Sequence, residues 1–475
     1  MHRVSVSALL LALCAVAAWA QQPIRVSETN YRYWEYNGAP VILLGGSKED
    51  NLFQIPDLKE HLDLLVSCGG NYIRNTMSSR DEGNVWPFAQ REDGKYDLEK
   101  TNDEYFRRFE SALQLAKERG IIVQIEMWDR FDFAQRFWSN NPYRPANNIN
   151  YTGEMSGLKN EYPDHPGSNK NPFFRSVPAL DNNALLLKYQ HAQVDRMLSI
   201  SLKFPNVLYC MDNETSGWEE WGAYWSDYVH AKAKEAGVTV NTTEMWDAWN
   251  LKDDVHKRTL DRPDRYSFAD ISQNNHNTGQ THWDNLQWVR DYIKDKPRPL
   301  NHVKIYGADG GRFGGSRDGI ERFWRGLIGG AASVRFHRPG SGLGLSEIAQ
   351  AHIRSARKLS DRFSFINAEP DVASTRLLER DANEAYATTG ENNAVVVYFT
   401  DGGAVKLDAP AFAHGATVEW LDASTSAWQE ALQVETNPIP LVAPGAGHWI
   451  ALVRQQHVPR TTRELEPAPQ TEPLR

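Results

Sequence analysis

Eight short runs of strand-forming residues alternate with helical periodicities between residues 41 and 360, and this alternation constrains the fold more than any other feature of the chain. Such runs form buried parallel strands, and the helical stretch after each run returns the chain to the start of the next strand. The expected strands are residues 41–44, 72–74, 121–125, 207–209, 238–240, 266–271, 303–306 and 333–337. Eight βα units predict a (β/α)8 TIM barrel.

The pattern changes after about residue 365, where short strands are separated by glycine-rich turns. We expect strands at 394–399, 405–407, 417–421 and 449–453. They predict a small antiparallel β-sandwich at 365–455, following a barrel domain at 21–364. Proline recurs in residues 456–475, which predicts a disordered tail.

The first twenty residues have the layout of a secretory signal peptide. Arg3 precedes a short apolar segment at 8–18 and a small-residue cleavage site ahead of Gln21. The apolar segment is shorter than the roughly 20 residues of a membrane span. We therefore expect a secreted or periplasmic protein without membrane insertion. Cys68 and Cys210 then remain, and because their spacing is not that of a disulfide framework we expect buried free thiols.

The charge balance bears on the class of partner. The chain has 52 Lys and Arg against 61 Asp and Glu, so its surface as a whole does not suit nucleic acid. No cysteine or histidine spacing is typical of a metal site, so we expect neither a metal nor a cofactor. The sequence leaves the oligomeric state open.

Active sites of TIM barrels lie at the C-terminal ends of the strands, so the residues after each run are the candidates for chemistry. The fourth run is followed by Asn213 and Glu214. A carboxylic acid held in place can protonate a leaving glycosidic oxygen, and a neighbouring amide can hold a sugar hydroxyl. We predict Glu214 as a general acid and Asn213 as a substrate ligand.

Together with this Asn-Glu pair, the entry at 25–46 and the motifs at 396–399, 420–422 and 444–449 resemble the clan A glycoside hydrolases. The chain looks most like the apiosidase-like subgroup, which ends in a module known as a collagen-binding domain. The resemblance spans about residues 24–454. It implies a barrel hydrolase of O-glycosidic bonds acting on a carbohydrate substrate, with Glu214 as acid/base and Asn213 and Arg74 binding sugar.

The chain departs from that family at strand seven, where members carry a nucleophilic glutamate and this sequence has Lys304. A lysine cannot form a glycosyl ester. We therefore predict an inverting hydrolase in which Glu214 is the acid and a second carboxylate activates water, with the two carboxyl groups about 6.5–9.5 Å apart.

The tetrapeptide Glu-Met-Trp-Asp occurs twice, at 126–129 after strand three and at 244–247 after strand five. Each copy offers acids beside a tryptophan that could stack on a sugar. Glu126 and Glu244 are the predicted second catalytic carboxylates, and Asp309 is a further candidate. The remaining predicted substrate ligands are Trp128, Asp129, Trp246, His276 and Tyr306.

Residues 298–338 are locally basic, with eight Lys or Arg against three acids. Lys304, Arg335 and His337 fall near strand ends. If they face the pocket, they favour an anionic sugar such as a uronic acid or a sulfated sugar, because cationic side chains bind such groups.

Several alternatives stay open. Lys304 in place of a nucleophile also fits a non-catalytic carbohydrate-binding protein on a degenerate barrel. A lyase could use Lys304 or Tyr306 as the base on a uronate. Glu214 could be a structural carboxylate paired with Arg74, and each tryptophan fits a core position as well as a sugar platform.

Overall fold

Eight parallel strands form a barrel in the computed structural model, which describes residues 21–308, 311–412 and 415–455. Each strand pairs with the next along the chain except at the fifth and sixth strands, and the last pairs with the first. Next to the fifth strand, Ser267 N donates to Thr242 O at 3.1 Å, which brings the chain before the sixth strand against it. In chain order the strands are β4 (Leu43–Gly46), β5 (Tyr72–Thr76), β8 (Ile122–Asp129), β9 (Val207–Asn213), β10 (Thr242–Thr243), β11 (Ala269–Asp270), β12 (Leu300–Ile305) and β13 (Ser333–Phe336).

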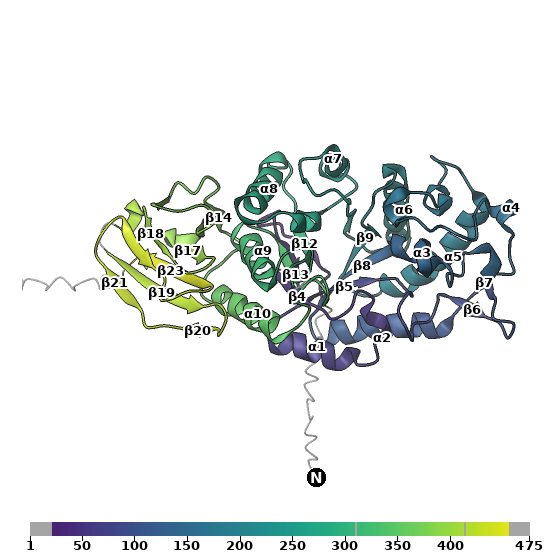
Figure 1. The fold of residues 1–475 in the computed structure, drawn as a ribbon, viewed down its shortest axis with the longest axis horizontal. Helices are drawn as coiled ribbons and strands as arrows, with labels where there is room; N and C mark the ends of the chain where they lie inside the picture. Colours follow the sequence, from purple (N-terminus) through teal and green to yellow (C-terminus); the bar gives the residue numbers. More distant parts are fainter. Residues whose placement is uncertain (1–20, 309–310, 413–414, 456–475) are drawn as a thin grey trace, which may run out of the picture.

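Helices follow the strands and surround the sheet (Figure 1), so the predicted (β/α)8 fold is confirmed. In α2 the side chain of Asn102 accepts a hydrogen bond from Glu104 N at the first turn, and Phe106, Phe109 and Leu113 lie buried at helical spacing. The main helices are α1 (Leu58–Ser67), α2 (Asp103–Glu118), α5 (Ala184–Ser201), α6 (Glu219–Glu235), α7 (Asp254–Leu260), α8 (Gly279–Tyr292), α9 (Ser316–Ile328) and α10 (Glu347–Ser360).

Shorter elements occupy the connections. They are β6 (Phe88–Gln90), β7 (Tyr96–Thr101), α3 (Gln135–Trp138), α4 (Gly153–Ser156) and the 3-10 helices η1 (Leu52–Gln54), η2 (Arg130–Phe133), η3 (Pro145–Asn147), η4 (Pro166–Ser168), η5 (Pro172–Arg175), η6 (Ser272–His276), η7 (Glu391–Asn393) and η8 (Pro410–Phe412). The long segment between β8 and α5 contains α3, α4 and the 3-10 helices η2 to η5.

The fifth strand lies later than its predicted position. Residues 238–240 read as a strand because they alternate valine and threonine, but Val238 is 40% exposed and its N–H bonds Ala233 O at the end of α6. The strand itself is the buried pair Thr242 and Thr243. Thr242 Oγ1 donates to Arg265 O at 2.8 Å, so a polar side chain is satisfied inside the fold.

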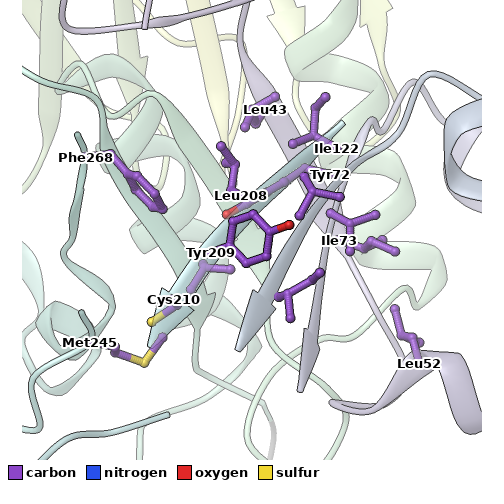
Figure 2. Close-up of a cluster of buried hydrophobic side chains, with 14 of the residues drawn as sticks. Leu43, Leu52, Tyr72, Ile73, Ile122, Leu208, Tyr209, Cys210, Met245 and Phe268 are labelled. Atoms are coloured by element: carbon purple, nitrogen blue, oxygen red, sulfur yellow. The ribbon is translucent and has the colours of Figure 1, made fainter. Parts of the chain in front are cut away.

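The barrel interior combines apolar and polar layers. Leu43, Leu208 and Phe268 come from different parts of the ring and belong to one buried cluster (Figure 2). Tyr72 OH donates to Gln124 Oε1 at 2.7 Å within this interior. Asn301 Nδ2 in turn donates to Tyr72 OH at 3.2 Å, so these buried polar side chains hydrogen-bond to one another.

A three-stranded antiparallel sheet precedes the barrel and is formed by β1 (Arg25–Val26), β2 (Trp34–Tyr36) and β3 (Ala39–Val41). Asn37 and Gly38 make the hairpin turn with positive φ angles of 52° and 78°. The fully buried Trp34 donates its indole N–H to Asn301 Oδ1 at 3.0 Å. This sheet therefore contacts the end of the barrel at which the strands begin.

Two antiparallel sheets follow the barrel and share a core that includes Leu407, Leu441, Val397 and Phe399. The predicted β-sandwich is confirmed. One sheet contains β14 (Glu369–Pro370), β16 (Ala385–Thr389), β17 (Val395–Phe399), β23 (Trp449–Gln455), β19 (Ala416–Asp422), β20 (Ala427–Trp428) and β21 (Leu432–Val434). The other contains β15 (Leu377–Leu378), β18 (Ala404–Leu407) and β22 (Ile439–Val442).

The sandwich packs on the barrel beside α9 and α10 (Figure 1). Trp324 of α9 stacks on Tyr398 with ring centroids 5.7 Å apart. Ser355 of α10 donates to Ala423 O at 2.7 Å. The contact is thus part of the main hydrophobic core.

Three sequence predictions concern parts of the chain outside the site. Cys68 and Cys210 are buried and free, as expected. The signal peptide at 1–20 and the tail at 456–475 lie outside the described residues. Within the described ranges, no helix combines the length and apolar character needed to cross a membrane.

Candidate active site

Glu214 lies at the C-terminal mouth of the barrel, immediately after β9. Its backbone is left-handed, with a φ of +59°, a conformation that non-glycine residues adopt at a cost and that is often retained at functional sites. Its Oε1 accepts hydrogen bonds from Lys304 Nζ at 2.7 Å and from Tyr306 OH at 3.1 Å. The side chain is 17% exposed, so a ligand can reach it.

Lys304 determines the charge state of Glu214. Burial by itself raises the pKa of Glu214, but the Lys304 ammonium, the Arg74 charge and the Tyr306 hydroxyl together outweigh burial, and the resulting pKa is about 2. Lys304 Nζ also donates to Asn213 Oδ1 at 2.5 Å. Glu214 is therefore ionised at neutral pH, which fits a base and does not fit the general acid that the sequence predicted.

Arg74 belongs to a separate buried ion-pair network and does not pair with Glu214 by hydrogen bond. Its guanidinium pairs with Glu126, with Nε 2.5 Å from Oε1, and also with Asp50. Glu126 is fully buried and both partners of the pair are closed to solvent. The predicted roles of Glu126 as a second catalytic carboxylate and of Arg74 as a sugar ligand do not fit this placement.

Asp129 is similarly engaged, because it forms an ion pair with Arg80. Arg80 NH1 also lies 3.2 Å from Asp132 Oδ1. Burial raises the pKa of Asp132 to about 7. Arg80 and Asp50 link this group to Arg74, so the mouth of the barrel on the β4, β5 and β8 side is a continuous network of paired charges.

Trp128 and Trp246 are both core residues, with exposures of 1% and 2%. Trp128 packs on Phe133, Phe173 and two tryptophans of α6. Trp246 donates its indole N–H to Thr259 Oγ1 at 2.8 Å. Neither ring presents a face to a sugar, so the predicted stacking roles are wrong.

Glu244 is also buried away from the mouth. It accepts hydrogen bonds from Thr215 Oγ1 at 2.5 Å and from Met245 N at 3.1 Å. A Cβ on Gly222 of α6 would lie 2.1 Å from Glu244 Oε2, so α6 covers this carboxylate. Burial raises its pKa to about 7. This position does not suit the predicted second catalytic carboxylate.

Asp247 is the carboxylate that the sequence analysis did not select. It follows β10, next to the end of β9, and its N–H donates to Thr215 O at 2.9 Å. Burial raises the pKa of Asp247, and the negative charge of Glu214 raises it further. It is half-buried, and among the described residues its carboxylate has no hydrogen-bond partner. Asp247 belongs to the repeated tetrapeptide, but the sequence did not show that its side chain, and not that of Glu244, is accessible.

The remaining predicted ligands divide into two groups. Tyr306 and His276 lie at the mouth near Glu214 and near each other, with ring centroids 6.5 Å apart. Arg335 is fully buried and donates to Val303 O at 2.8 Å. His337 is buried 3.7 Å from Asp50 Oδ1, and burial lowers its pKa well below the usual value. Arg335 and His337 thus do not offer charge to an anionic substrate.

Two further points concern the predicted chemistry of the mouth. Asp309 lies outside the described residues. Burial raises the pKa of Tyr306 well above 10, and its hydroxyl is engaged with Glu214, so Tyr306 does not suit the base of a lyase. Among the residues that the structure describes, no group of three or more His, Cys, Asp or Glu could hold a metal ion.

Solved structures show that this fold occurs in glycoside hydrolases. A glycoside hydrolase family 5 protein from Bacteroides vulgatus ATCC 8482 matches with a TM-score of 0.61 and 13% identity, over 91% of this chain and 92% of its own. A second structure, described as a glycoside hydrolase, matches with a TM-score of 0.55 and 12% identity, over 91% and 97% of the two chains. No family model and no curated protein matches the sequence.

Proposed function

We propose that the protein is a glycoside hydrolase that cleaves O-glycosidic bonds of a polysaccharide or oligosaccharide outside the cell. The observation that carries the proposal is the pair of carboxylates after β9 and β10, whose pKa values are shifted in opposite directions. The pKa of Glu214 is lowered and that of Asp247 is raised. Such divergence separates a base from an acid at one pH. The fold shared with glycoside hydrolase structures supports a carbohydrate substrate.

Asp247 serves as the proton donor in this mechanism. Its proton passes to the glycosidic oxygen as the bond from that oxygen to the anomeric carbon breaks. Glu214 takes a proton from a water molecule, and the oxygen of that water forms the new bond to the anomeric carbon. The acid and base roles are thus the reverse of those that the sequence predicted for Glu214.

Lys304 keeps Glu214 ionised and oriented. The pair of Lys304 Nζ and Glu214 Oε1 at 2.7 Å is almost wholly buried, so the ammonium strongly favours the charged carboxylate. Because Glu214 acts as the base in this proposal and Lys304 cannot form a glycosyl ester, water is the attacking group. The anomeric configuration of the product is therefore inverted.

The test is hydrolysis of a panel of neutral and acidic polysaccharides, detected through new reducing ends, with the product anomer read by proton nuclear magnetic resonance. Glu214→Gln is expected to abolish release. Because this change leaves Lys304 buried without its partner, a Glu214→Gln, Lys304→Met double variant provides a matched protein in which both charges are removed. If either variant is folded and turns over at the wild-type rate, the proposed base is wrong. Retention of configuration would overturn attack by water.

A second candidate is a carbohydrate-binding protein without catalysis. The specific observation in its favour is that Lys304, near the end of β12, pairs with Glu214 directly and so occupies the carboxylate that catalysis would need. Binding of a sugar with no release of reducing ends across the whole panel would favour this candidate. Reducing ends accompanied by the ultraviolet absorbance of an unsaturated uronate would instead indicate elimination.

A further inference from the structure

A cavity of about 320 Å³ opens beside the candidate active site. The loop after β10 contributes Trp249, η6 contributes His276, the loop after β12 contributes Arg312 and Phe313, and α9 contributes Arg322. None of these residues is required by the acid and base roles of Glu214 and Asp247. The cavity is therefore available for a part of the substrate away from the reacting atoms.

Tyr306 connects the cavity to the catalytic carboxylate. Its hydroxyl lies 3.1 Å from Glu214 Oε1, and its ring centroid lies 4.4 Å from that of Phe313. The width of one aromatic ring thus separates Glu214 from the cavity wall. A sugar unit in the cavity would lie close to the unit whose glycosidic bond reaches Glu214.

The walls of the cavity are aromatic. Trp249 is 60% exposed and stacks on His276 with centroids 4.1 Å apart and planes at 9°. His276 in turn meets the edge of Phe313 at 4.9 Å. The exposed indole therefore extends an aromatic surface on which the apolar face of a sugar ring can pack. Burial lowers the pKa of His276 to about 4, so its imidazole is neutral and can exchange hydrogen bonds with hydroxyl groups.

The charge of the cavity differs from that of the rest of the mouth. Among the residues that the structure describes, its lining contains two arginines and no acid. Elsewhere in the mouth the cations Lys304, Arg74 and Arg80 are each paired with a carboxylate. Arg312 is exposed and rests 4.6 Å over the ring of Phe313, and within residues 21–308, 311–412 and 415–455 it has no carboxylate partner. Its guanidinium is thus free to bind an anion.

Arg322 holds the cavity in shape instead of binding a ligand. Its guanidinium donates to Phe313 O at 2.8 Å, to Tyr306 O at 3.0 Å and to Asn277 O at 3.0 Å. These carbonyls belong to the segments that carry the aromatic walls. The site is therefore organised before a ligand arrives, which reduces the entropy lost on binding.

We propose that this cavity is a subsite for an anionic sugar unit, whose carboxylate or sulfate is bound by Arg312 and whose ring lies against Trp249 and Phe313. The inference rests on the proposed function, because the cavity is a substrate subsite only if a glycosidic bond is cleaved at Glu214. In the sequence analysis, the binding of an anionic sugar was assigned to Lys304 and Arg335. Because Arg335 is buried and Lys304 is paired, the proposal assigns that role to Arg312. A guanidinium fork suits both carboxylate and sulfate geometries.

The experiment measures the affinity of the whole protein for pairs of probes by isothermal titration calorimetry. The probes are trimers of galacturonate, glucuronate and mannuronate with their methyl esters, and a sulfated galactan trimer with its desulfated form. At least one anionic probe is expected to bind about tenfold more tightly than its neutral counterpart, because a charge-assisted hydrogen bond contributes about that much. The uronate and sulfate pairs distinguish the two anions. The proposal is overturned if no anionic probe is preferred.

Variants identify the group responsible. Arg312→Gln is expected to remove the preference for the anionic probe and to change binding of the neutral probe by less than twofold. Trp249→Ala is expected to weaken both. The matched control is Arg196→Gln on α5, since Arg196 is also exposed and lies 5.6 Å over a phenylalanine ring, that of Phe106. Equal affinities of the Arg312→Gln and Arg196→Gln proteins for the anionic probe would reject Arg312 as the anion ligand.

Hydrolysis is measured separately on the same probes. A charge preference in binding without release of reducing ends supports the subsite and rejects the proposed hydrolysis. Release from neutral and anionic probes alike, with no charge preference in binding, rejects the subsite and leaves the hydrolase intact.

Discussion

The two copies of Glu-Met-Trp-Asp have the same four residues at the ends of β8 and β10 but contact different partners. In the first copy Glu126 pairs with Arg74 and Asp129 with Arg80. In the second copy Glu244 is covered by α6 and, among the described residues, accepts hydrogen bonds from neutral groups only, whereas Asp247 is half-buried beside Glu214. Identical sequence therefore yields a structural charge network on one side of the mouth and a candidate proton donor on the other.

The largest expected difference between the copies concerns their aspartates. Asp247→Asn removes the proposed proton donor and is expected to lower kcat about 10²- to 10⁴-fold. Asp129→Asn leaves the donor intact, so we expect a loss of kcat below tenfold, together with lower stability. Steady-state hydrolysis of one substrate by both folded variants makes the comparison. Equal losses would show that Asp247 has no special role.

The glutamates are expected to differ in stability. Glu126→Gln deprives the buried Arg74 of one of its two carboxylates and should lower the free energy of unfolding by about 3 kcal/mol. Glu244→Gln replaces a carboxyl group whose folded pKa is about 7 and which ionises at pH 6 only when the chain unfolds, so we expect no loss of stability and a gain of up to about 2 kcal/mol. Urea unfolding at pH 6 measures both. Similar losses in the two variants would contradict the structural distinction.

The raised pKa of Glu244 also predicts a pH dependence. Its folded pKa of about 7 exceeds the ordinary value of 4.5, so the folded protein holds this proton more tightly than the unfolded chain does. The resulting stabilisation is full below pH 4.5 and is lost as pH rises through about 7. Relative to wild type, Glu244→Gln should thus gain stability between pH 4.5 and 7 and level off above. Parallel stability curves for the two proteins would contradict the assignment.

The smallest expected effect is the loss of the cation beside Trp246, which we compare with the loss of the Trp128 ring. Arg258 lies 5.1 Å over the ring of Trp246 and is partly exposed, whereas the neighbours of Trp128 include four aromatic rings. Arg258→Gln should cost about 0.5 kcal/mol. Truncating the first tryptophan, Trp128→Ala, should cost about 3–5 kcal/mol. Thermal unfolding compares them, and a loss above 2 kcal/mol for Arg258→Gln would show that Trp246 depends on its cation.

The fold was accessible from sequence because strand and helix periodicities are local properties. The prediction of the fifth strand was wrong. Residues 238–240 have the residue types of a strand, whereas the strand itself consists of Thr242 and Thr243, which are buried although they are polar. Threonine enters that core because Arg265 O accepts its hydroxyl proton. No local pattern reports a partner that lies more than twenty residues away.

The site was accessible only in part. Its location followed from the rule that barrel chemistry lies at strand ends, and this rule selected Glu214, Lys304 and Tyr306. Asp247, Trp249 and Arg312 were missed in the sequence analysis. These side chains can contact a substrate because they are accessible and, among the described residues, the two charged ones have no ion-pair partner. Neither property can be read from residue type.

The sequence by itself determined the barrel, the sandwich and the presence of a lysine, Lys304, near the end of the seventh strand, since these depend on periodicity and on residue identity at strand ends. Only the tertiary structure decided which charges are paired. The ionic state of Glu214 illustrates the reason, because Lys304, ninety residues away in the chain, lies 2.7 Å from it in the folded barrel. The strength of such a contact depends on distance and burial, and folding alone sets both.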